Sequence, residues 1–207
     1  MIRLLFLGLI FLPPVYADKL SDLNHTLNNK LDNPALLEQA LKQGSERASV
    51  CKYCHGKTGN SRRGYIPNLA AQNPKYLLHQ FELFASGQRK DKIMSELANN
   101  LSADDRINIA LYYASQKIKP KPAEASATSQ KGENIFHARC ASCHGINGYG
   151  KELLPRIASQ PGRYLKKTLR AYQTNSRKRP NSPMQEIAAG LKKDELDAVV
   201  EFISAMQ

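Results

Sequence analysis

All four cysteines of this 207-residue chain lie in two copies of one short pattern. The copy that begins at Cys51 is CKYCHG, and the copy that begins at Cys140 is CASCHG. In each copy two thiols with two residues between them are followed at once by an imidazole, at His55 and His144. Two thiols and an imidazole can make a disulfide, a redox dithiol, or part of a metal or cofactor site. The histidine that closes both copies has to be explained.

Each of these chemistries makes a different demand on the chain. A thioredoxin-like dithiol needs a βαβ context, which the sequence does not predict, and a structural zinc site needs four ligands where each copy offers three. A disulfide within either cysteine pair has no use for the histidine. Covalent haem attachment uses every residue, because the thiols add to the two haem vinyl groups and the imidazole binds the iron. The predicted attachment residues are Cys51, Cys54, Cys140 and Cys143, with His55 and His144 as iron ligands.

Methionine is the predicted second iron ligand on the other side of each haem. Met1 leaves with the N-terminal signal and Met206 is the penultimate residue, so one methionine remains per half, at Met94 and Met184. A single methionine usually fills a core, but matched placement in two copies favours ligation. A thioether ligand closes the iron and raises its reduction potential, which suits electron transfer. The three remaining histidines, His25, His79 and His137, are predicted to be ordinary surface or helix residues.

The elements that must position these residues occur twice along the chain. PNLAAQNPKYL begins at Pro67 and PRIASQPGRYL begins at Pro155, 88 residues later, while the two cysteine motifs are 89 apart and the two methionines 90 apart. Small drifts of this kind are what loop insertions produce, so we infer an internal duplication. The Pro-, Ala- and Ser-rich stretch between the copies is typical of a linker. The predicted division is 18–116 for the first domain, 117–131 for the linker and 132–207 for the second domain.

Helical periodicity predicts a mostly α fold. The segment 33–44 opens with an Asn-Pro pair and is expected to end at Gly44, and the segment 73–87 carries an apolar stripe and stops at Gly87. The segment 102–116 begins with Ser102 and Asp105 at capping-box spacing. In the segment 192–206, helical spacing places one apolar face, formed by Leu196, Val199, Val200 and Ile203.

The first 17 residues have the pattern of an export signal. Arg3 precedes an apolar run from Leu4 to Leu12, and Ala17 offers a small residue for cleavage. The apolar run ends at Pro13-Pro14, well short of the roughly 20 residues that span a bilayer. We therefore expect cleavage after Ala17 and a periplasmic location, with an uncleaved N-terminal tether as the alternative.

The paired motifs, together with IPNLAAQ and LPRIASQ after them, resemble the diheme cytochrome c4 family over essentially the whole mature chain. The resemblance implies two tandem class I cytochrome c domains, each wrapping one covalently bound haem c. It also implies that the backbone carbonyls of Pro67 and Pro155 accept hydrogen bonds from Nδ1 of His55 and His144, which orients each ring and raises its basicity. A simple turn is the other interpretation of these prolines.

The resemblance implies an electron-transfer protein and not an enzyme. The expected function is a periplasmic carrier that moves single electrons from a membrane-bound quinol-oxidising complex to a terminal oxidase or reductase. Similar chains serve as cytochrome subunits of sulfur-compound-oxidising enzymes such as flavocytochrome sulfide dehydrogenases, and this is the alternative. The sequence has no cysteine beyond the two motifs and no dinucleotide-binding glycine motif.

The positive charge of the chain is concentrated in its second half. The formal net charge is +12, and residues 18–116 hold 13 basic against 10 acidic residues while residues 117–207 hold 16 against 8. A basic surface attracts nucleic acid, anionic lipid or an acidic protein. Export argues against nucleic acid, leaves peripheral membrane association open, and favours a redox partner.

The basic stretch 166–180 is the predicted docking patch for an acidic redox partner, with a simple solvated helix face as the alternative. Charge reversal at Arg177, Lys178 and Arg179 is expected to slow bimolecular electron transfer at low ionic strength, because it removes the attraction that steers encounter. Stopped-flow kinetics at low and high salt check this. Unchanged rates at low salt contradict it.

Overall fold

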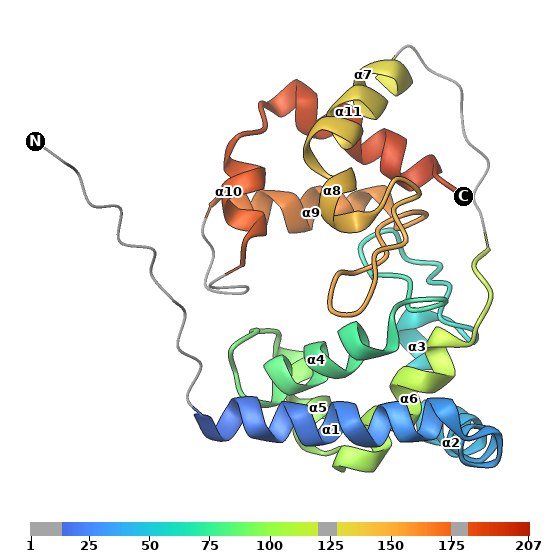
Figure 1. Cartoon of the computed structure of the whole chain (residues 1–207). Helices are drawn as coiled ribbons and strands as arrows, with labels where there is room; N and C mark the ends of the chain where they lie inside the picture. Colours follow the sequence, from blue (N-terminus) through green and yellow to red (C-terminus); the bar gives the residue numbers. More distant parts are fainter. Residues whose placement is uncertain (1–13, 120–127, 175–181) are drawn as a thin grey trace, which may run out of the picture.

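The computed structural model describes residues 14–119, 128–174 and 182–207 (Figure 1). These ranges consist of helices joined by loops. The only β-type pairing within them is a single bridge between Lys151 and Leu154. The prediction of a mostly α fold is confirmed.

The first half contains a long N-terminal helix followed by a bundle that includes the first cysteine motif. Its helices are α1 (Pro14–Asp32), α2 (Pro34–Arg47), α3 (Lys52–His55), α4 (Pro74–Ala85), α5 (Lys92–Asn99) and α6 (Ala103–Ala114). α2 packs on α6, and α4 packs on both α5 and α6. The short α3 carries the first motif.

Within the described ranges, the second half repeats this arrangement without a counterpart of α1. Its helices are α7 (Thr128–Arg139), α8 (Ala141–His144), α9 (Gly162–Gln173), α10 (Met184–Ala189) and α11 (Lys193–Ala205). α7 packs on α11, and α9 packs on both α10 and α11, as their counterparts do. Figure 1 shows the two halves one above the other, with the loops that follow α3 and α8 lying between them. The shared packing pattern agrees with an internal duplication.

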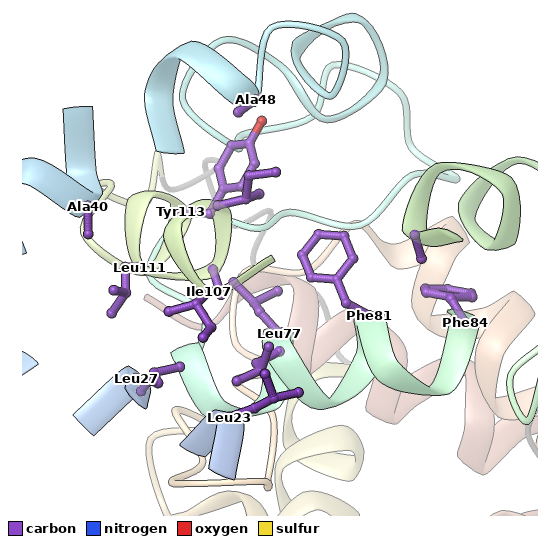
Figure 2. Packing of buried hydrophobic residues seen from close by; sticks show 14 residues of the cluster. Leu23, Leu27, Ala40, Ala48, Leu77, Phe81, Phe84, Ile107, Leu111 and Tyr113 are labelled. Carbon is purple, nitrogen blue, oxygen red and sulfur yellow. The ribbon is translucent and has the colours of Figure 1, made fainter. Parts of the chain in front are cut away.

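α1 extends the core of the first half. Leu23 and Leu27 are buried and lie beside Leu77 of α4 (Figure 2). Nζ of Lys19 lies 3.1 Å from a carboxylate oxygen of Glu82, a buried residue whose other oxygen lies 3.1 Å from Nε of Arg106. A buried carboxylate needs such partners, because desolvating an unpaired charge is costly. Apolar contact and this ion pair together hold α1 against α4.

In each half two helices cross at a glycine. A Cβ atom on Gly44 would lie 2.1 Å from the carbonyl oxygen of Asn108 in α6, and one on Gly132 would lie 2.3 Å from that of Ala198 in α11. No side chain fits at such distances, so both crossings require glycine. These crossings fix the N-terminal helix of each bundle against its C-terminal helix, and each cysteine motif follows the N-terminal helix directly.

The expected end of the first helix at Gly44 is wrong. α2 continues to Arg47, and Gly44 lies inside it at the crossing with α6. A glycine near a helix end usually marks a stop, but here close packing requires it. The Asn33 cap, the stop of α4 before Gly87, and the capping box of Ser102 and Asp105 are confirmed.

Parts of the predicted N-terminal and linker segments lie outside the described residues. Residues 1–13 of the predicted signal and 120–127 of the predicted linker are not described, and neither are residues 175–180 of the predicted docking patch. α1 begins at Pro14, before the predicted cleavage site, and α7 begins at Thr128, inside the predicted linker. Among the described helices, none is long and apolar enough to cross a membrane.

Gly44→Ala and Gly132→Ala are each expected to lower the free energy of unfolding by about 1–3 kcal/mol, because the added methyl group forces two helices apart. Gly162→Ala is the matched control, since its Cβ would have no neighbour closer than 3.6 Å. The control is expected to leave stability unchanged or slightly raised, as alanine favours helix. Chemical denaturation of the haem-loaded variants checks this. Equal stability of all three variants contradicts it.

Candidate haem sites

A single helical turn brings together the two thiols and the imidazole of each motif. The backbone N–H of His55 donates to the carbonyl of Cys51 at 2.9 Å, and that of His144 donates to Cys140 at the same distance. Gly56 and Gly145 end these turns with φ of 82° and 78°, a conformation that favours glycine. The conformation turns the chain away directly after each histidine.

The His55 ring is buried, and its orientation is fixed by the backbone. Nδ1 of His55 lies 3.0 Å from the carbonyl oxygen of Pro67. Since a carbonyl only accepts, Nδ1 carries the proton and donates, which leaves the lone pair of Nε2 for a metal. Burial lowers the pKa of His55, although the bond to Pro67 raises it. The ring is therefore neutral at pH 7, as an iron ligand must be.

The second half reproduces this geometry. Nδ1 of His144 lies 2.9 Å from the carbonyl oxygen of Pro155. Burial lowers the pKa of His144, and the bond to Pro155 again opposes this shift. Both expected proline contacts are thus present, with the ring nitrogen donating in each.

The four cysteines are free thiols in this structure. Cys143 is exposed and the other three are half-buried. Burial raises the pKa of Cys51 and raises that of Cys140 to about 11, so both thiols are protonated at pH 7. Within the described ranges, no group of three or more His, Cys, Asp or Glu side chains is placed to hold a metal ion. The thiols and the single imidazole of each motif therefore suit a cofactor that itself supplies most of the ligands to its metal.

The two candidate methionines lie in the first turns of matching helices. Met94 is in α5, where its backbone N–H donates to the capping carboxylate of Asp91 at 3.1 Å. Met184 begins α10, and its N–H lies 3.3 Å from the hydroxyl oxygen of Ser182. Both side chains are half-buried, and Met94 packs against the first core. Their role as iron ligands stays a prediction.

The other histidines lie apart from these positions. His79 is half-buried in α4, and burial lowers its pKa. His25 lies in α1, and His137 lies in α7, 3.9 Å from a carboxylate oxygen of Glu133.

The halves meet through the loops that follow the two prolines, and two glutamines connect these loops reciprocally. Gln160 accepts from the N–H of Asn68 at 2.9 Å and donates to the Asn68 carbonyl at 2.8 Å. Gln72 accepts from the N–H of Arg156 at 2.6 Å and donates to the Arg156 carbonyl at 2.9 Å. Both glutamines are 4% exposed. Four buried hydrogen bonds therefore join the loops that also hold the two histidine rings.

Two buried polar side chains near the motifs each have an atom without a protein hydrogen-bond partner, and this observation tests whether a haem fits. Arg156 is 1% exposed and donates through its terminal nitrogens to the carbonyls of Ala70 and Ala158, but its Nε has no hydrogen-bond partner. Among the described residues no carboxylate lies within ion-pair distance of it. Burial lowers the pKa of Arg156 to about 10. Buried charges need a counter-charge, and haem propionates are such groups.

Tyr113 is the second such group. Its hydroxyl is buried without a partner and points toward Ala48, at the end of α2 (Figure 2). Burial raises the pKa of Tyr113 far above its usual value, and Cys51 adds to this shift. The Tyr113 hydroxyl is thus a buried donor beside the first motif with no acceptor from the protein, and a bound cofactor could supply one.

Sequence reasoning did not identify Gln72, Gln160, Arg156 or Tyr113 as part of these sites. The signal for the glutamines was present, because they occupy matching positions in the repeat, 88 residues apart. Nothing in the sequence marked Arg156, which stands where the first half has Asn68.

Paired helical motifs, each with a buried imidazole tied to a proline carbonyl, define a c-type cytochrome with two haem-binding halves. The family profile for cytochrome c matches residues 129–207. The chain is 33% identical over 175 residues to cytochrome c4 of Pseudomonas aeruginosa, covering 79% of this chain and 87% of that protein. The chain belongs to the cytochrome c4 family. It is therefore an electron-transfer protein with two covalently attached haem c groups, and not an enzyme.

Two further comparisons agree with this assignment. The fold matches the crystal structure of reduced recombinant cytochrome c4 from Pseudomonas stutzeri with a TM-score of 0.74 and 29% identity, covering 80% of this chain and 98% of that one. The chain is also 31% identical over 172 residues to the thiosulfate dehydrogenase electron acceptor of Thiomonas intermedia, covering 76% of this chain and 79% of that protein.

Proposed function

We propose that this chain is a periplasmic diheme electron carrier whose irons are closed by His55 and Met94 in domain 18–116 and by His144 and Met184 in domain 132–207. In this proposal Cys51, Cys54, Cys140 and Cys143 form the thioether bonds. The observation that carries it is the paired geometry of the two rings, each with Nδ1 donating to a proline carbonyl and Nε2 left for iron. Cleavage after Ala17 and export belong to the same proposal.

The haem irons supply reversible one-electron chemistry when bound, and the protein's residues determine how it is used. Buried imidazoles held in one tautomer present a fixed nitrogen ligand. Methionine sulfur on the opposite side would close each iron to exogenous ligands and favour the ferrous state. Arg156 offers a buried cation to the haem carboxylates. Together these histidine, methionine and arginine side chains suit a protein that takes up and releases electrons without binding a substrate.

The proposed partners are membrane redox complexes. A quinol-oxidising complex would reduce the protein, and a terminal oxidase or reductase would oxidise it. Short, non-covalent encounters suit such a carrier, and charge complementarity speeds them. α9 presents Lys167 and Arg170 as exposed cations, and the predicted docking patch continues beyond the described residues.

A second candidate is an electron acceptor for a sulfur-compound-oxidising enzyme, which the similarity to a thiosulfate dehydrogenase electron acceptor supports. The two candidates differ in which donor reduces the oxidised protein. Mixing it with thiosulfate dehydrogenase and thiosulfate, or with membranes and a quinol, gives two reduction rates. Faster reduction by the dehydrogenase favours the second candidate, and faster reduction by the quinol-oxidising complex favours the first.

Met94→Ala and Met184→Ala test the ligation directly. Each variant is expected to lose about half of the weak near-infrared sulfur-to-iron absorption of the ferric protein, because one of two Met-ligated irons is opened. The potential of that haem is expected to fall, since the thioether that favours ferrous iron is gone. Met206→Ala is the control and should keep the full band. An unchanged band in either test variant contradicts the proposed ligand in that half.

A further inference from the structure

The carbonyl that holds each histidine ring belongs to a peptide group that also contacts the opposite half. The Pro67 carbonyl accepts from Nδ1 of His55 at 3.0 Å. The N–H of the same peptide group, on Asn68, donates to Oε1 of Gln160 at 2.9 Å. A continuous line of hydrogen bonds therefore runs from the ring of the first half, through one peptide group, to a side chain of the second half.

The second half has the same line in the reverse direction. Nδ1 of His144 donates to the Pro155 carbonyl at 2.9 Å, and the N–H of that peptide group, on Arg156, donates to Oε1 of Gln72 at 2.6 Å. Both glutamines and both rings are buried, with exposures of 4% to 8%. Water is largely excluded from both lines, so their hydrogen bonds polarise one another.

We propose that Gln72 and Gln160 are crossed positioning residues, each of which sets the electron-donating strength of the histidine in the opposite half. The inference rests on the ligation by His55 and His144 proposed above. A peptide N–H that donates to a glutamine oxygen makes its own carbonyl more negative. The carbonyl then draws the Nδ1 proton more strongly, which increases the negative charge on Nε2.

A more electron-rich Nε2 stabilises ferric over ferrous iron and lowers the reduction potential. The electron taken up on reduction resides on the iron, and Nδ1 keeps its proton in both states. Each domain thereby adjusts the potential of the haem in the other domain through contacts that exist only while the halves are docked.

The potentials of the two haems in Gln160→Leu and Gln72→Leu provide the test. Gln160→Leu is expected to raise the ferrous-to-ferric ratio of the N-terminal haem about threefold at fixed solution potential, which is about 30 mV at 59 mV per decade. Gln72→Leu is expected to do the same to the C-terminal haem. NMR during stepwise reduction assigns each potential to its haem.

The Nδ1–H resonances of the ferrous protein, labelled with nitrogen-15 at histidine, give an independent measurement. The His55 resonance is expected to move upfield in Gln160→Leu and to stay in place in Gln72→Leu, and the His144 resonance is expected to show the reverse. Asn73→Leu is the matched control. It removes hydrogen bonds of 2.6 Å to the Leu154 carbonyl and 3.3 Å to the Tyr149 carbonyl across the same contact. Neither carbonyl belongs to a peptide group that holds a histidine ring, so the variant is expected to move neither resonance.

Gln160→Glu and Gln72→Glu keep the size of the side chain and an acceptor for the peptide N–H but lose the donor to the facing carbonyl, so they separate the effect of the acceptor from that of the donor. Each is expected to leave the potential of the opposite haem at or below that of the parent protein. In the leucine variants, unchanged potentials, a shift in the same half as the substitution, or equal shifts of both haems overturn the inference. If both haems stay low-spin and six-coordinate in the leucine variants but their potentials do not shift as expected, the inference fails and the proposed function stands.

Discussion

The hydrogen bond from each buried imidazole to a proline carbonyl is the constraint on which the rest of the structure depends. It selects one tautomer of His55 and of His144 and leaves one nitrogen free to bind iron. To place that carbonyl, the chain must turn sharply after the cysteine motif and return past the ring. The glycine after each histidine permits the turn, and the crossing of α2 with α6, or of α7 with α11, supports it.

The same loops also join the two halves, so ring orientation and domain docking are not independent. The peptide group that holds a ring is bonded to a glutamine of the other half. The duplication is not symmetric, because Arg156 stands where the first half has Asn68. A buried arginine with an unpartnered Nε gives the contact region one positive charge from the second half only. The two halves therefore contribute unequal charge to the region where they meet.

Features encoded by short-range patterns were predictable from the sequence. The motif spacing predicted the haem positions, the offset of 88 to 90 residues indicated the duplication, and helical periodicity located α4, α6 and α11. Gly44 was misinterpreted because glycine is common at a helix stop and is also required where two helices cross closely. The glutamine pairs join residues 84 and 92 positions apart. Such contacts depend on how two folded halves dock, which no local pattern specifies.

Covalent attachment of a haem at each motif is the central claim, and the intact mass of the purified, exported protein tests it most directly. We predict a mass equal to that of the mature polypeptide plus two haems, with a pyridine haemochrome assay giving two haems per chain. After proteolysis, one haem should stay on the peptide that contains Cys51 and Cys54 and one on the peptide that contains Cys140 and Cys143. A mass equal to the polypeptide alone, or a single haem, would contradict this account.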